Sequence, residues 1–185
     1  MAIENPIDML THEHKYILKV VHALSVIGED LHRDGQVDVD LIQKVVRFMR
    51  NFADKCHHAK EEAVLFPAME DKAVPKTGWP LAALRAEHDK GRKLVTTLKE
   101  AAEAYPAGRL EAAEEISNAI GGIRQLYPTH IWKEDEMVFP MAKRLFTVDE
   151  LKQLITDFDK AERDFGQDHD QYIAFANEME LLLGR

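Results

Sequence analysis

Residues 52–67 read FADKCHHAKEEAVLFP, and an altered copy, YPTHIWKEDEMVFP, occupies residues 127–140. When His57 is aligned with His130, each copy has a glutamate four residues after the histidine, and a Phe-Pro pair follows. Residues four apart on an α-helix lie on the same face, one turn apart. An imidazole and a carboxylate placed in this way, and supplied twice, predict a two-metal site in a helical protein. The pairs are His57 with Glu61 and His130 with Glu134.

The repeat extends upstream of these stretches. Glu13 and His14 precede the first copy, and Glu87 and His88 precede the second. The interval from His14 to His57 is 43 residues, and that from His88 to His130 is 42. Such self-similarity predicts two structural halves, each a helix with one histidine followed by a helix with His-x-x-x-Glu.

The composition bounds the class of protein. With 185 residues, of which 45% are hydrophobic and 31% charged, the chain is typical of one soluble domain with a full core. A net charge of −9 without a basic stripe argues against a nucleic-acid partner. No apolar run is long enough to predict a membrane span, and the first residues lack the pattern of a signal peptide. These features and a single cysteine favour a cytoplasmic location.

Hydrophobic periodicity predicts an all-α protein. Four helices are expected as an up-down antiparallel bundle within residues 1–146, and a Thr147–Glu150 capping box predicts a fifth. Residues 147–185 are therefore expected to form a C-terminal helical extension packed on the bundle, which Gly166 would bend or split. The expected helices cover about residues 5–31, 39–71, 79–104 and 109–144, with the fifth after residue 147.

Four histidines and two glutamates fall within the apolar stripes of these helices. A buried carboxylate costs several kcal/mol unless it is paired or binds a metal. Imidazole and carboxylate ligands suit iron, manganese or zinc, and two bridging carboxylates favour a pair of ions. Counted against the octahedral geometry of two ions, such a set together with one bridging oxygen leaves on the order of two coordination positions open, which favours chemistry or small-ligand binding. The predicted metal ligands are His14, His57, Glu61, His88, His130 and Glu134.

Several other residues carry two interpretations each. His58 is rotated by about 100° from His57 on an α-helix, so His57 is the preferred ligand. His22 and His169 are each interpreted as an additional imidazole near the site or as an ordinary histidine. Tyr127 is either a hydrogen-bond donor to a bound ligand or a core residue.

Three further side chains adjoin the predicted ligands. Cys56 is either a redox-active thiol or inert buried filling. Glu62 and Asp135 follow the two bridging positions, and each is either a solvated flank or a partner that orients a histidine.

These residues resemble the hemerythrin-like family, also called the HHE cation-binding domain, over about residues 9–146. The resemblance rests on Glu13-His14, on residues 57–67, on Glu87-His88 and on residues 130–140. It implies an up-down four-helix bundle with an oxo- or hydroxo-bridged, non-haem di-iron centre. It also implies that the four histidines are terminal ligands and the two glutamates bridging ligands.

The sequence departs from the oxygen-carrying members at two places. Arg92 stands where those proteins have a second histidine in the third helix. The bridging residue of the fourth helix is a glutamate four residues after His130, although Asp135 stands at the fifth position. This pattern is more similar to the branch linked to iron-centre repair, nitric-oxide or peroxide handling, and iron or oxygen sensing.

Three functional hypotheses follow. The first is that a di-iron protein binds or senses dioxygen or nitric oxide. The second is a redox enzyme that detoxifies peroxide or nitric oxide, with iron cycling between Fe(II) and Fe(III). The third is iron storage, donation or iron-centre repair. Zinc or manganese in place of iron is compatible with the ligand set.

Overall fold

The computed structural model describes residues 5–107, 111–165 and 169–183, and these ranges contain helices but no strands. The prediction of an all-α bundle is confirmed. No helix within these ranges is both long and apolar enough to cross a lipid bilayer. The α-helices are α1 (Pro6–Asp34), α2 (Val39–Phe48), α3 (Phe66–Asp71), α4 (Leu81–Ala104), α5 (Ala112–Lys133), α6 (Phe139–Leu145), α7 (Val148–Phe165) and α8 (His169–Leu182). Three segments are π-helical and therefore wider than an α-helix: η1 (Met49–His58), η2 (Glu61–Leu65) and η4 (Glu134–Val138). One segment, η3 (Tyr105–Ala107), is a tighter 3₁₀ turn.

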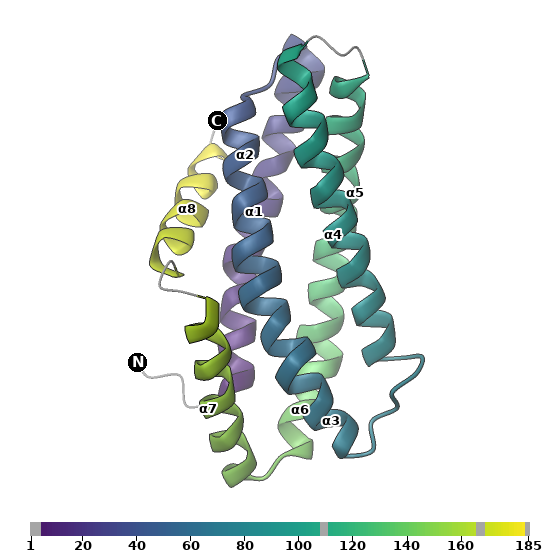
Figure 1. The fold of residues 1–185 in the computed structure, drawn as a ribbon, viewed down its shortest axis with the longest axis vertical. Coiled ribbons are helices and arrows are strands. Elements are labelled where there is room, and N and C mark those ends of the chain that lie inside the picture. The colour runs from purple at the N-terminus through teal and green to yellow at the C-terminus, as the bar shows by residue number, and fades with distance from the viewer. Residues whose placement is uncertain (1–4, 108–110, 166–168, 184–185) are drawn as a thin grey trace.

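The elements form four long rods side by side (Figure 1). The first is α1, the second runs from α2 to α3, the third is α4, and the fourth runs from α5 to α6. Helix α4 packs against α5 and α2, and α1 packs against α5. The helix ends are set locally. The Asn5 side chain accepts the Ile7 N–H at 2.9 Å before Pro6, and Gly35 ends α1 with a φ of 64°.

The π-helical segments η2 and η4 lie at matching places in the two halves. Each ends with a backbone N–H that reaches back five residues, from Phe66 to the Glu61 carbonyl and from Phe139 to the Glu134 carbonyl. A proline follows each phenylalanine, and it lacks an N–H and crowds the carbonyl of the fourth residue before it. The wider turn relieves this conflict, so each rod continues past its proline.

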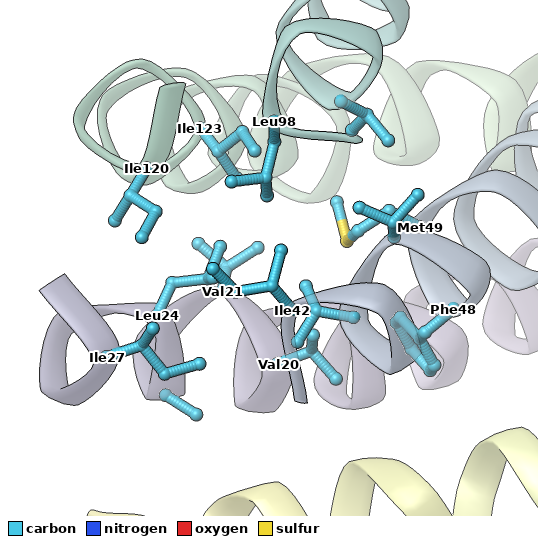
Figure 2. Packing of buried hydrophobic residues seen from close by; sticks show 14 of the residues in the cluster. Val20, Val21, Leu24, Ile27, Ile42, Phe48, Met49, Leu98, Ile120 and Ile123 are labelled. Carbon is cyan, nitrogen blue, oxygen red and sulfur yellow. The ribbon is translucent and has the colours of Figure 1, made fainter. Parts of the chain in front are cut away.

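Two apolar clusters fill the bundle and leave a polar layer between them. The larger cluster joins α1, α2, α4 and α5, and Figure 2 shows Leu24 and Ile27 of α1 facing Ile120 and Ile123 of α5. The smaller cluster, which includes Leu10, joins α1 to α3, α6 and α7. The predicted site residues lie in sequence between members of the two clusters, so apolar packing closes the layer at both ends.

Residues beyond the bundle form two helices, α7 and α8, and the expectation was one helix that is bent or split at Gly166. They lie along one side of the bundle (Figure 1), with α8 against α1 and α7 against η1 and η2. Gly166, the predicted point of bending, falls outside the described residues. The extension covers only one side, and its effect on the site is described below.

Two adjacent glycines in α5 provide a test of the packing. A Cβ added at Gly121 would meet nothing within 4 Å, whereas one at Gly122 would lie 2.5 Å from Leu94 Cδ2. Gly121→Ala is therefore expected to raise the free energy of unfolding by about 0.5–1 kcal/mol, the usual helix-interior gain. In Gly122→Ala, displacement of Leu94 should cancel that gain. Urea denaturation of both variants measures the difference, and equal stabilisation would contradict the tight α4–α5 contact.

Candidate metal centre

The polar layer brings together the six side chains predicted as ligands. His14 from α1 and His57 from η1 form one pair, with their Nε2 atoms 3.0 Å apart. His88 from α4 and His130 from α5 form a second pair, with Nε2 atoms 3.1 Å apart. All four are buried, and Glu61 and Glu134 are each 0% exposed. The side chains thus converge from all four rods of the bundle.

The two glutamates lie between the histidine pairs, and each divides its oxygens between them. Glu61 Oε1 lies 3.6 Å from His57 Nε2, and its Oε2 lies 3.5 Å from His88 Nε2. Glu134 Oε2 lies 3.3 Å from His14 Nε2, and its Oε1 lies 3.3 Å from His130 Nε2. A carboxylate with one oxygen toward each of two nitrogen pairs has the arrangement of a bridging ligand.

None of the four carboxylate oxygens has a hydrogen-bond partner. Buried polar groups without partners are rare because desolvation is costly. Burial and the neighbouring Glu134 carboxylate hold the pKa of Glu61 well above its usual range. His14, His57, Glu61 and Glu134 offer ligand atoms within 4.8 Å of one another, and so do His58, His88 and His130. A cation would satisfy these oxygens.

The opposite nitrogen of each of the four histidines faces a carboxylate. His14 Nδ1 lies 2.9 Å from Asp135, and His57 Nδ1 lies 2.9 Å from Glu13. The corresponding contacts in the other half are His88 Nδ1 to Glu62 at 2.6 Å and His130 Nδ1 to Glu87 at 3.0 Å. Each carboxylate accepts a hydrogen bond from an Nδ1–H, which orients the ring so that its Nε2 faces the layer. This donor set fits a pair of metal ions.

The carboxylates behind the histidines are themselves held by cations. Lys60 contacts Glu13, and Lys133 contacts Glu87 at the matching position of the second half. The two pairs differ in exposure, because α7 and α8 cover only the first. Lys60 is 0% exposed, whereas the Lys133 side chain is 25% exposed.

The residues whose roles the sequence left open lie in different parts of the structure. Glu62 and Asp135 both orient histidines, as one of the two interpretations held. His22 is exposed and lies by Ser25 on the surface, away from the site. His169 of α8 lies 3.7 Å from Glu13 Oε1, so it adjoins the carboxylate behind His57 rather than the ligand atoms.

Two further residues lie at the edge of the polar layer. Tyr127 is buried and lines a narrow crevice with His58 and His88. Cys56 is buried, and burial raises the pKa of its thiol to about 12, so the thiol is protonated and unreactive at neutral pH.

His58, which was not among the predicted ligands, is also buried beside the polar layer. It is 3% exposed, and its ring stacks on that of His88. His57 and His58 are the last two residues of the π-helical segment η1. Two consecutive histidines are the only trace of this in the sequence.

Protons compete with metal ions for the ligand atoms of the site, so metal affinity should depend on pH. Burial opposes a charge on His14, but the neighbouring carboxylates of Asp135 and Glu134 outweigh this effect and raise its pKa to about 9. A metal must displace this proton and also the proton that the raised pKa of Glu61 retains, so affinity should rise by at least about tenfold per pH unit while these groups are protonated. The proton on His14 stabilises the metal-free fold fully below about pH 6.5, and this stabilisation is lost as the pH rises through about 9.

Iron(II) titrations under anaerobic conditions at several pH values between about 6 and 8 measure this dependence. Burial lowers the pKa of His57 to about 4, so that histidine is already neutral in this range and adds no slope. Replacement of Asp135 by Asn should flatten the dependence. An affinity that is independent of pH in the unmodified protein would contradict a proton on His14.

The fold and the site define a helical-bundle protein with buried histidine and glutamate groups that could hold a metal. The sequence signature of the hemerythrin HHE cation binding domain matches residues 5–142. The chain therefore belongs to the hemerythrin HHE cation-binding family. Uncharacterized proteins of Mycobacterium tuberculosis and Mycobacterium bovis are similar, each 23% identical over 168 residues, which are 90% of this chain. The match spans 65% of the length of these relatives.

Proposed function

We propose that this protein holds two iron ions in the polar layer and binds a small diatomic ligand, dioxygen or nitric oxide, at that pair. The observation that carries the proposal is the division of each buried glutamate between the two histidine pairs. Glu61 directs one oxygen toward His57 and the other toward His88, and Glu134 divides its oxygens in the same way. A single ion would not need two carboxylates that each face both pairs.

An iron pair would supply redox-active metal with open coordination positions for a diatomic ligand. The protein's own part is to hold the imidazoles in place. Carboxylates on Nδ1 fix the ring orientation so that each Nε2 faces the layer. The apolar clusters above and below the layer keep bulk water away.

Burial of the layer favours a ligand of very few atoms. The six side chains are between 0% and 4% exposed, so a large substrate has no direct route to them. A narrow crevice adjoins the His88–His130 pair and is lined partly by Leu126 and Tyr127. The crevice is too narrow for a water molecule as it stands, so side-chain motion must widen it, and a ligand of very few atoms requires the least widening.

The experiment is to measure metal content in protein produced with ample iron, then to follow its optical spectrum. The iron protein is reduced without oxygen and is then exposed to dioxygen or to nitric oxide. About two irons per chain and a new, reversible absorption band are expected. No iron, or a single zinc ion, would overturn the proposal.

The same experiment separates the alternative functions. Immediate oxidation without a stable band, together with rapid consumption of added peroxide, would favour a detoxifying redox enzyme. Rapid loss of iron to a chelator would favour storage or donation. Either result would replace ligand binding as the function while leaving the metal pair in place.

A further inference from the structure

A second cavity of the protein lies between η1 and α4, and none of the six predicted metal ligands lines it. Its volume is about 300 Å³, which equals the bulk volume of about ten water molecules. A compact organic molecule of about ten non-hydrogen atoms therefore fits. The lining residues are Met49, Arg50, Asp54, Lys55, Arg92, Val95, Thr96 and Tyr127.

The local helix geometry gathers the polar side chains of η1 on this cavity. Hydrogen bonds in a π-helix reach back five residues, so residues four and five apart lie on nearly the same face. Arg50, Asp54 and Lys55 have this spacing within η1. The Asp54 carboxylate accepts a 2.8 Å hydrogen bond from Arg92 Nε of α4, and this contact joins the two walls of the cavity.

The cavity carries two cations that no carboxylate of the described residues neutralises. Arg50 is partly exposed, and its guanidinium makes one long hydrogen bond, from Nη2 to Thr96 Oγ1 at 3.3 Å. Lys55 is exposed and has no ion-pair partner in the described ranges. Arg92 differs from both, because it donates hydrogen bonds to three carboxylates. The lining is thus locally positive in a chain with a net charge of −9, which favours an anion.

The buried part of the lining is apolar and contains one polar group. Met49 and Val95 are 1% and 3% exposed, so they offer an apolar surface. Tyr127 is 4% exposed, yet its hydroxyl makes no hydrogen bond to any residue that the structure describes. Buried hydroxyls nearly always have a partner, so this hydroxyl marks a position where a ligand atom would be bound.

A glycine of α4 provides the space in which this hydroxyl lies. Gly91 is buried inside the helix, where glycine is less favourable than alanine. A Cβ added at Gly91 would lie only 3.0 Å from Tyr127 Oη. The absence of a side chain at residue 91 therefore lets Tyr127 of α5 lie against α4 and reach the cavity.

We propose that this cavity binds a small organic carboxylate that also carries a hydroxyl group. The carboxylate pairs with the guanidinium of Arg50, whose planar fork matches a carboxylate. The apolar body of the ligand lies on Met49 and Val95, and its hydroxyl forms a hydrogen bond with that of Tyr127. 4-Hydroxybenzoate has this combination of groups and the required size, so it is the probe. The site does not depend on the proposed metal pair.

Isothermal titration calorimetry with 4-hydroxybenzoate and the full-length protein at neutral pH tests the proposal. Arg50→Gln removes the charge and should weaken binding by about 10- to 100-fold. Arg47→Gln changes an exposed arginine of α2, one turn before Arg50, and is the matched control that should bind normally. Tyr127→Phe should weaken binding of 4-hydroxybenzoate by about 2- to 10-fold and leave binding of benzoate, which has no hydroxyl, unchanged.

Two further titrations of the unmodified protein make the test independent of how the variants fold. Neutral 4-hydroxybenzamide should bind at least about tenfold more weakly than the carboxylate. Because a carboxylate can also bind a metal, the titration is repeated after a chelator has removed iron, and the affinity should be unchanged.

The proposal has clear contrary outcomes. Binding that disappears with the iron would place the carboxylate on a metal and overturn it. Equal affinities of Arg50→Gln and Arg47→Gln, or equal affinities of the amide and the carboxylate, would also overturn it. So would the absence of binding to the unmodified protein.

Discussion

Glu61→Gln is expected to make the metal-free protein more stable and to abolish binding of the metal pair. In the folded protein, burial and Glu134 disfavour the charged form of Glu61 and raise its pKa, whereas the unfolded chain ionises normally. This penalty is absent below the unfolded pKa of about 4.5 and grows as the pH rises toward the folded value. A neutral amide avoids it, so we expect a gain of about 1–4 kcal/mol at neutral pH without metal.

The opposite result is expected when iron is present. The amide cannot bridge two cations as a carboxylate does, so metal no longer raises the unfolding temperature. Thermal unfolding with a chelator and with excess iron(II) measures both effects. Glu136→Gln, an exposed change in the same π-helical segment as Glu134, is the control and should change neither. Two tightly bound irons in Glu61→Gln would remove the bridging role.

Lys60→Met is expected to be among the most destabilising single substitutions in the chain. Lys60 is 0% exposed and contacts Glu13, which is 3% exposed, with Glu162 3.7 Å away. Burial opposes the charge on Lys60, but the Glu13 carboxylate raises its pKa above the usual value. Removal of the ammonium leaves a buried carboxylate without its cation, a change that costs about 3–5 kcal/mol. The unfolding temperature should fall by about 6–20 °C.

The repeat supplies the matched control. Lys133 contacts Glu87 in the same way, but both side chains are about a quarter exposed, at 25% and 23%. Solvent screens such a pair, so Lys133→Met should cost no more than about 1 kcal/mol. Equal losses in the two variants would show that the cover provided by α7 and α8 does not govern the energy of the Glu13–Lys60 pair.

The sequence predicted the bundle and the convergence of six side chains because both depend on regular geometry. Periodic apolar residues predict helices, and a repeat with intervals of 43 and 42 residues predicts that His14 meets His57 and His88 meets His130. The assignment of these six residues as metal ligands stays a prediction. Of the carboxylates behind the histidines, Glu62 and Asp135 were identified only as open alternatives, and Glu13 and Glu87 were assigned no such role. Contacts between residues as distant as His14 and Asp135 require the fold.

The burial of His58 against His88 was not predicted, because the two neighbouring histidines were compared only for which was the better ligand. The prolines at 67 and 140 give a reason for η2 and η4, but no proline follows η1 closely. The burial of Lys60 was also beyond the sequence. Its counterpart Lys133 has the same local neighbours, and the difference arises from an extension more than a hundred residues away in the chain.

The way the carboxylates cross between the halves has a kinetic consequence. Each histidine pair lies within one half, but Asp135 holds His14 across 121 residues, and Glu61 and Glu134 each face both pairs. The layer therefore closes only when the two hairpins dock, late in folding, because distant contacts require the largest loops to close. Interactions completed after the folding barrier slow unfolding more than they speed folding. A metal pair bound in this layer would hold the two halves together. The rate at which the ions dissociate would then be limited by the rate at which the two halves separate.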